Sequence, residues 1–138
     1  PTLPAPLTVT GDARVTLYVS SDAPDTDFMV RLCDVDEAGR SVKLADGILA
    51  ARFRNGFSAP EYLEPGKVEK LVIRTSKISH CFLPGHRLRV SVTSGAKHFV
   101  FPNSNTKDAY NSTESRVAHN TVWHGGAAPS HILLHVER

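Results

Sequence analysis

The stretch that decides the fold is Gly85-His86-Arg87-Leu88-Arg89-Val90-Ser91-Val92. From its third residue onward, apolar and polar side chains alternate strictly: Leu88, Val90 and Val92 share one side, and the arginines and the serine share the other. A period of two is typical of a β-strand with one buried face. The stretch therefore predicts a half-buried strand of a β-sandwich.

Similar alternation recurs along the chain, and turn residues separate its segments. Pro65-Gly66 and Pro84-Gly85 mark turns, and Asp36-Glu37-Ala38-Gly39 is typical of a hairpin. We expect an all-β fold: a jelly-roll (galactose-binding-like) or immunoglobulin-type antiparallel β-sandwich of about eight or nine strands. The predicted strands cover residues 7–10, 14–21, 27–36, 41–44, 47–53, 68–75, 87–92, 117–123 and 131–136.

The composition fits one soluble domain over residues 1–138. The formal net charge is only +2, and the basic residues are scattered, which argues against nucleic acid as a partner. Apolar runs stay far below the ~20 residues that cross a bilayer, and the Pro-rich opening lacks the regions of a signal peptide. Membrane insertion is therefore not expected, and the cytoplasm is the favoured compartment.

The sequence has two cysteines, Cys33 in a predicted strand and Cys81 in a predicted loop. They are expected to be reduced and mostly buried thiols rather than a disulfide.

The histidines and aspartates predict no metal and no cofactor. His131 and His135 lie on a predicted strand, where their spacing separates them by ~13 Å, too far for one ion to bridge. His119 and His124 are expected to point to opposite faces. Asp25-Thr26-Asp27 ends a loop where carboxylates could gather around calcium. The EF-hand ligand order is missing, so an Asx turn is the favoured interpretation.

No catalytic residue is predicted. The Gly-x-Ser-x-Gly elbow is absent from the sequence, and so is the strand-helix alternation that this elbow requires. A Ser-His-Asp triad could be chosen from Asp108, His119 and Ser130, but nothing in their spacing favours this choice over others. Phe99, Phe101 and Tyr110 could line a sugar-binding groove, although aromatic residues of β-sandwiches more often fill the core.

The order of short motifs resembles the C-terminal jelly-roll domain of the X-Pro dipeptidyl-peptidase and cocaine esterase family. Each motif is weak alone, but their order and spacing are specific, and they cover nearly the whole chain. The motifs are Val9-Thr10-Gly11, residues 20–28, residues 31–35, Gly39-Arg40, residues 46–49, Arg52-Phe53-Arg54, Pro65-Gly66, residues 85–89 and Phe101-Pro102-Asn103-Ser104-Asn105-Thr106.

The resemblance implies a non-catalytic part of a serine hydrolase. Members of the family combine an α/β-hydrolase domain that bears the Ser-Asp-His triad, a helical cap and this β-domain, and they act on esters and amides, including X-Pro peptides. The resemblance therefore implies that the chain is a C-terminal fragment, that the hydrolase and cap domains are its partners, and that it stabilises the catalytic domain and helps shape its cleft. An apolar face made for them could also support a homodimer.

Structural roles follow for several polar residues. Asp27 is expected to form a charge-assisted pair with Arg52 or Arg54, which would tie a loop to a neighbouring strand. His86 is expected to donate a hydrogen bond at the start of its strand.

The resemblance also implies an interdomain contact. The family's loop that faces the hydrolase body corresponds to Phe101, Pro102, Asn103 and Asn105, with Ser104 standing where the family usually has a charged or Arg-like residue.

Two alternatives remain open. A stand-alone carbohydrate-binding module would use exposed aromatic platforms such as Trp123, Tyr110 or Tyr62, and a glycan titration would reveal saturable binding. A small interaction domain without an attached enzyme would be recognised from the coding sequence upstream of Pro1.

Overall fold

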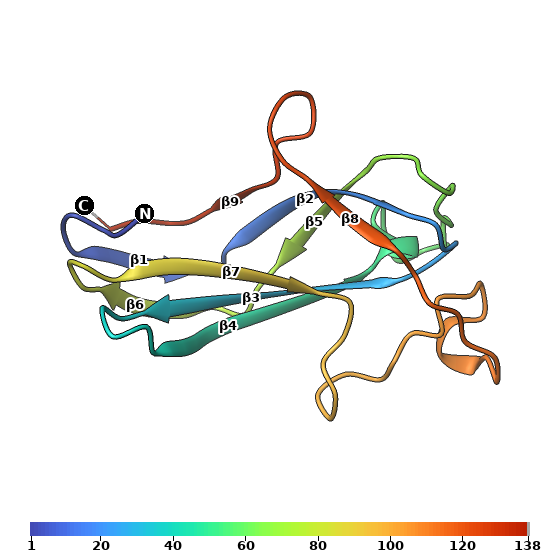
Figure 1. Ribbon diagram of the computed structural model, residues 1–138, viewed down its shortest axis with the longest axis horizontal. Coiled ribbons are helices and arrows are strands. Elements are labelled where there is room, and N and C mark those ends of the chain that lie inside the picture. Colours follow the sequence, from blue (N-terminus) through green and yellow to red (C-terminus); the bar gives the residue numbers. More distant parts are fainter. Residues whose placement is uncertain (138) are drawn as a thin grey trace.

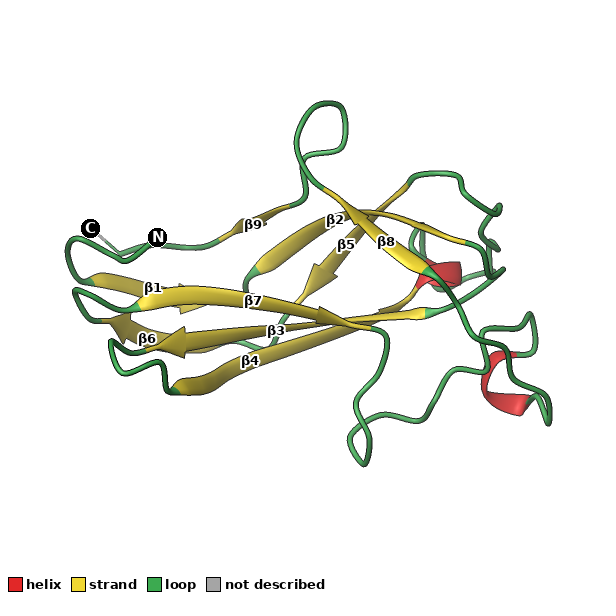
Figure 2. Cartoon of the chain, viewed as in Figure 1, coloured by secondary structure: helices red, strands yellow, loops and turns green. Residues whose placement is uncertain are grey.

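The computed structural model describes residues 1–137, whose regular secondary structure is almost all β-strand, joined by long loops (Figures 1 and 2). Two 3-10 turns, η1 and η2, interrupt the strands. The elements are β1 Leu7–Gly11, β2 Arg14–Ser21, β3 Asp27–Val35, β4 Ser41–Ala50, η1 Ala51–Phe53, β5 Glu69–Arg74, β6 Ile78–Phe82, β7 Arg87–Thr93, η2 Ala109–Asn111, β8 Asn120–Trp123 and β9 His131–Leu133.

The strands form two facing layers and a smaller pair. One layer has the order β5-β2-β8, with β9 also pairing with β2, and the other has the order β4-β3-β7. Strands β1 and β6 form a two-stranded sheet at the end of the sandwich that holds the N-terminus (Figure 1). All pairings are antiparallel. The predicted all-β antiparallel sandwich is confirmed.

The core lies between the two layers. Val15, Leu17 and Val19 from β2 meet Phe28 and Val30 from β3, and each of these side chains is at most 3% exposed. The inward face that alternation predicts for β2 is the face that is buried here, and the predicted face of β3, with Phe28, Val30 and Leu32, is buried too. Burial of apolar area is the main stabilising contribution to such a core.

The prediction of two strands over residues 41–44 and 47–53 is wrong. Residues 41–50 form one continuous strand, β4, and the chain then turns through η1. The register against β3 shifts between Leu32 and Cys33, whose partners are Ala45 and Lys43. This irregularity inserts one extra residue into β4 and interrupts the period of two, so that the sequence pattern resembles two short strands.

The structure contains one strand that the sequence did not predict, β6, which pairs with β1. The predicted loop position of Cys81 is wrong, since Cys81 belongs to β6. It is exposed, whereas Cys33 is buried, and both thiols are free. The alternation in β6 was obscured because His80 lies between Ile78 and Phe82 on the same side of the strand, its ring centroid 4.8 Å from that of Phe82 in an edge-on arrangement.

The last two strands are shorter than predicted. Strand β8 begins at Asn120 rather than at residue 117, and β9 ends at Leu133 rather than at residue 136. Beyond β9 the pairing continues only as an isolated bridge between Val136 and Val9.

Strand β3 is buried on both of its faces. Met29 and Cys33 alternate with the core residues of this strand and point away from the core, yet they are only 3% and 5% exposed. The neighbouring strands flank them, and the segment after β7 approaches the same face, where Phe99 lies under the Lys43 ammonium at 5.4 Å. The outer face of the β4-β3-β7 sheet therefore supports the loop that follows β7.

No helix within residues 1–137 is long and apolar enough to span a membrane.

Candidate functional site

The segment between β7 and β8, residues 94–119, projects from the sandwich beside the β4-β3-β7 layer (Figure 1). It contains the interdomain residues that the sequence predicted, together with η2. We call residues 95–116 of this segment the docking loop, after the role that is proposed for it below. Its position is fixed by polar side chains at its base, and its aromatic side chains are exposed.

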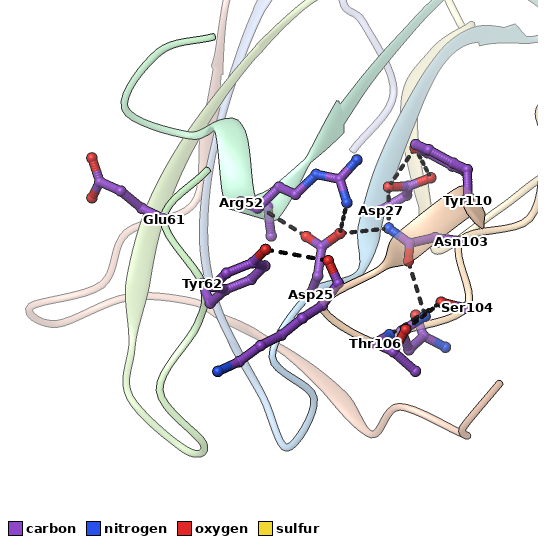
Figure 3. A network of polar contacts seen from close by, with 12 residues as sticks. Asp25, Asp27, Arg52, Glu61, Tyr62, Asn103, Ser104, Thr106 and Tyr110 are labelled. Carbon is purple, nitrogen blue, oxygen red and sulfur yellow. Dashed lines mark hydrogen bonds and ion pairs between the residues drawn. The ribbon is translucent and has the colours of Figure 1, made fainter. Parts of the chain in front are cut away.

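Two buried carboxylates hold the base of the docking loop. Asp25 and Asp27 flank the start of β3 and are 0% and 1% exposed. The side-chain amide of Asn103 donates to Asp25 Oδ2 at 2.9 Å and to Asp27 Oδ1 at 2.8 Å (Figure 3). Because buried carboxylates are costly without donors, this one amide ties the loop to the sandwich.

The Tyr110 hydroxyl provides a second tie to Asp27. It donates to the two carboxylate oxygens at 2.9 and 3.1 Å (Figure 3). Burial and the neighbouring carboxylate raise the pKa of Tyr110 to about 12, so the hydroxyl keeps its proton and remains a donor. Burial also raises the pKa of Asp27, against the opposing effect of its hydrogen bonds from Asn103 and Tyr110.

The ion pairs differ from those predicted for Asp27. Arg52 Nη1 lies 3.3 Å from Asp25 Oδ2, and the Arg52 backbone N–H donates to Asp25 Oδ1 at 3.0 Å. Arg54 pairs with Glu69 at 3.3 Å. The partner of Arg52 is thus Asp25, because the backbone bond at the start of η1 brings residue 52 against the turn that precedes β3.

The upper part of the docking loop is organised by its own side chains. Asn103 Oδ1 accepts the Asn105 N–H at 2.9 Å, and the Asn105 side chain donates to the Arg116 carbonyl at 2.8 Å. Asn105 has a φ of 61°, a left-handed conformation that asparagine tolerates better than most residues. Both predicted asparagines therefore shape the loop, whereas Phe101 and Pro102 are exposed on it.

An open pocket of about 480 Å³ lies between the docking loop and the β4-β3-β7 sheet. Residue type alone favoured core positions for the aromatic side chains, although the resemblance placed Phe101 on the interdomain loop; Phe99, Phe101 and Tyr110 are 59%, 85% and 48% exposed. The reason is that the loop leaves the sandwich, so these rings have no second layer to cover them. The pocket is lined by Asp27, Ile48, Phe99, Val100, Phe101 and Tyr110.

The other aromatic candidates for a sugar platform are dispersed. Trp123 lies in β8 and donates from its indole nitrogen to Ser20 Oγ at 3.0 Å. Tyr62 donates to the Lys107 carbonyl at 3.2 Å, and the Lys107 ammonium lies 5.3 Å from the Tyr62 ring centroid. Tyr62 therefore joins the segment before β5 to the docking loop.

His86 makes the side-chain contact that was predicted at the start of its strand. Its Nδ1 lies 2.8 Å from Asp34 Oδ1, and His80 Nε2 lies 2.9 Å from Asp34 Oδ2. Asp34 on β3 therefore connects β6 with the start of β7. Sequence reasoning missed Asp34 and His80, since their contact requires the unpredicted pairing of β6.

The remaining chemistry candidates make structural hydrogen bonds. His119 contacts Asp22 at 2.9 Å, and Ser130 donates to the Trp123 carbonyl at 2.7 Å, so the arbitrary triad with Asp108 is not assembled. Within residues 1–137 there is no group of three or more His, Cys, Asp or Glu side chains placed to hold a metal ion.

A second hollow of about 340 Å³ opens between the two layers, where β7 faces β8 and β9. Its walls are mainly apolar and include Val90, Val92, Val122 and Ile132. His124 and His131 also line it.

The structure is thus a β-sandwich with one long projecting loop, in which His119 and Ser130 make hydrogen bonds to Asp22 and to the Trp123 carbonyl. The chain belongs to the family of the X-Pro dipeptidyl-peptidase C-terminal non-catalytic domain, whose sequence profile matches residues 1–133. It is the C-terminal non-catalytic type of domain found in cocaine esterase-like hydrolases, as the resemblance implied.

Relatives and solved structures agree with this assignment. Cocaine esterase from Rhodococcus sp. (strain MB1 Bresler) is 39% identical over 132 residues, which are 94% of this chain and 23% of that enzyme. An aminopeptidase from the marine sediment archaeon Thaumarchaeota archaeon superposes with a TM-score of 0.93 at 28% identity, covering 100% of this chain and 25% of that one. An α-amino acid ester hydrolase superposes with a TM-score of 0.93 at 26% identity, covering 99% and 24%. The chain thus spans about a quarter of the length of these relatives.

Proposed function

We propose that this chain is the accessory domain of a serine hydrolase that cleaves esters or amides, X-Pro peptides among them. In that role it stabilises the catalytic domain and helps shape its cleft. The relatives support the proposal because they are hydrolases about four times as long as this chain. An α/β-hydrolase domain and a cap domain are its partners.

The observation that carries the proposal is the combination of a fixed base and an exposed apolar tip in the docking loop. Asn103 and Tyr110 hold the base on buried carboxylates, while Phe101 is 85% exposed. A loop that is ordered yet presents large apolar side chains to solvent is suited to a partner surface. Phe101, Pro102, Asn103 and Asn105 are therefore the proposed interdomain residues.

The first test concerns catalysis. The 138-residue chain is assayed alone against ester and X-Pro amide substrates, and no turnover above the buffer rate is expected. Turnover that survives repurification and removal of contaminating hydrolases would contradict a non-catalytic role.

The second test concerns docking. Phe101→Ser is introduced into the intact hydrolase polypeptide that carries this domain, with Phe57→Ser as the matched control, since Phe57 is 80% exposed on a different loop. We expect Phe101→Ser to lower the thermal midpoint by several degrees and to increase proteolytic release of the domain. Equal behaviour of the two variants would contradict the proposed contact.

The exposed patch also bears on self-association. When the catalytic domain is absent, two copies of the chain can cover the same aromatic side chains. Weak dimerisation of the isolated chain is therefore part of the proposal, and Phe101→Ser should abolish it in sedimentation experiments.

A further inference from the structure

The pocket beside Asp27 has an unbalanced charge. Asp25 and Asp27 are both almost fully buried, but the cation that pairs with them, Arg52, contacts Asp25. Asp27 accepts hydrogen bonds from Asn103 and Tyr110, which are neutral donors. The three charged side chains therefore leave one negative charge when both carboxylates are ionised.

Arg52 is not arranged to serve the second carboxylate directly. Its Nη1 is directed to Asp25, and its buried Nε has no hydrogen-bond partner among residues 1–137. Its guanidinium carbon lies 5.4 Å from the Tyr110 ring centroid and 4.9 Å from that of Phe53. The arginine is thus held against Asp25 and near two rings, and it is not among the residues that line the pocket.

The walls of the pocket suit a cation with an apolar stem. Aromatic ring faces attract ammonium and guanidinium groups, by about 0.5–2 kcal/mol depending on desolvation. Two of the three pocket rings already meet cations of this chain, Phe99 with Lys43 and Tyr110 with Arg52. Among the described residues no such cation lies over Phe101, the most exposed ring of the pocket.

We propose that the pocket lined by Asp27, Ile48, Phe101 and Tyr110 receives an arginine or lysine side chain from the hydrolase body. Its stem packs against Phe101 and Ile48, and its charged head lies toward Asp27, as long basic side chains do when they cover apolar surface. This inference rests on the proposed function, because the occupant comes from the part of the polypeptide that the relatives have beyond this domain. The net negative charge of the Asp25, Asp27 and Arg52 group beside the pocket favours a cation there over an apolar or acidic side chain.

The cation has a consequence for Asp27 that can be measured. Burial raises the pKa of Asp27 in the isolated chain. A positive charge seated nearby favours the ionised carboxylate and should lower that pKa.

One experiment uses a side-chain analogue on the 138-residue chain. n-Butylguanidinium is titrated into isotopically labelled protein, with the neutral n-butylurea as a control of nearly the same shape. We expect saturable changes in the NMR chemical shifts of Ile48, Phe101 and Tyr110, and a fall in the pKa of Asp27. The urea should bind at least about tenfold more weakly, which corresponds to a difference of about 1.4 kcal/mol in binding free energy. Equal binding of the two compounds, or no response at these residues, would overturn the inference.

The intact hydrolase provides the second experiment, a crystal structure that shows what occupies the pocket. An arginine or lysine of the catalytic or cap domain in the pocket supports the inference. An apolar or acidic side chain there overturns it and leaves the docking proposal standing. A docking loop that faces solvent in the intact protein contradicts the proposed function, and this inference with it.

Discussion

The Asn103 side chain donates to Asp27 at 2.8 Å, although the two residues are 76 positions apart in the sequence. The same amide nitrogen also donates to Asp25. One residue of the docking loop thus satisfies two buried carboxylates at the start of β3. The order of the loop and the stability of the sandwich are therefore linked.

Asn103→Ala should destabilise the chain. Asp25 and Asp27 would each lose one donor while keeping those from Arg52 and Tyr110, and a hydrogen bond to a charged group contributes about 1.5–3 kcal/mol. Chemical denaturation measures the loss in free energy of unfolding. Asn55→Ala is the control, because the Asn55 amide donates to Glu61 on the exposed surface, and we expect less than about 0.5 kcal/mol there. Equal costs for the two variants would contradict the anchoring role.

The pH dependence of Asp27→Asn tests the environment of that carboxyl. Its pKa in the folded chain is raised by burial, so its contribution to stability is fully present below the unfolded pKa and is lost as the pH rises through the folded pKa. Asparagine does not titrate. The native chain should therefore exceed Asp27→Asn in free energy of unfolding by most at pH values below the ordinary pKa of an aspartate. This difference should shrink as the pH is raised toward neutrality. Unfolding free energies at several pH values give this difference, and an advantage that grows with pH would show that the pKa is lowered.

Gly47→Ala should disturb the packing of β4 against β5. A Cβ atom at this position would clash with the Arg74 carbonyl, which belongs to backbone and cannot turn away. Overpacking of this kind costs about 1–3 kcal/mol. Gly95→Ala is the matched control, since a Cβ atom there meets nothing within 4 Å. The measurement is the thermal unfolding midpoint of both variants. A Gly47→Ala midpoint equal to that of Gly95→Ala would mean that β4 and β5 move apart more easily than the structure implies.

Phe28→Ala should remove the largest contribution to the core from β3. The side chain is 1% exposed and lies between the two layers. Truncation of a buried phenylalanine costs about 3–5 kcal/mol, because apolar contacts are lost and a cavity remains. Phe57→Ala, at an 80% exposed position, should change the free energy of unfolding by less than about 0.5 kcal/mol. A small effect of Phe28→Ala would place the core elsewhere.

Local alternation predicted the strands that carry the core, because β2 and β7 keep a period of two and Phe28, Val30 and Leu32 share one face of β3. It failed where a polar residue or an irregularity breaks that period. His80 obscured β6, and the register shift opposite Leu32 divided β4 into two apparent strands. In both places the pairing with a distant strand decides the structure, and a single segment does not contain that information.

The candidate site was predictable in part. Asp27, Asn103 and Asn105 were expected to matter, from the family resemblance, and the structure brings the first two into contact. The partner of Arg52 was not predictable, since Asp25 and Asp27 are equivalent in sequence and only the start of η1 selects between them. Residue type alone favoured a core position for Phe101, whereas the family resemblance placed it on a loop that faces another domain, and the structure shows the side chain 85% exposed.

The most direct measurement of docking compares hydrogen–deuterium exchange in the isolated chain and in the intact hydrolase. Residues 99–101 should exchange at least about tenfold more slowly in the intact protein, since burial at an interface suppresses local opening. Residues 55–58, on the loop that holds Phe57, should exchange at the same rate in both proteins. Equal exchange of residues 99–101 in the two proteins would contradict the assignment of the docking loop as the interdomain contact.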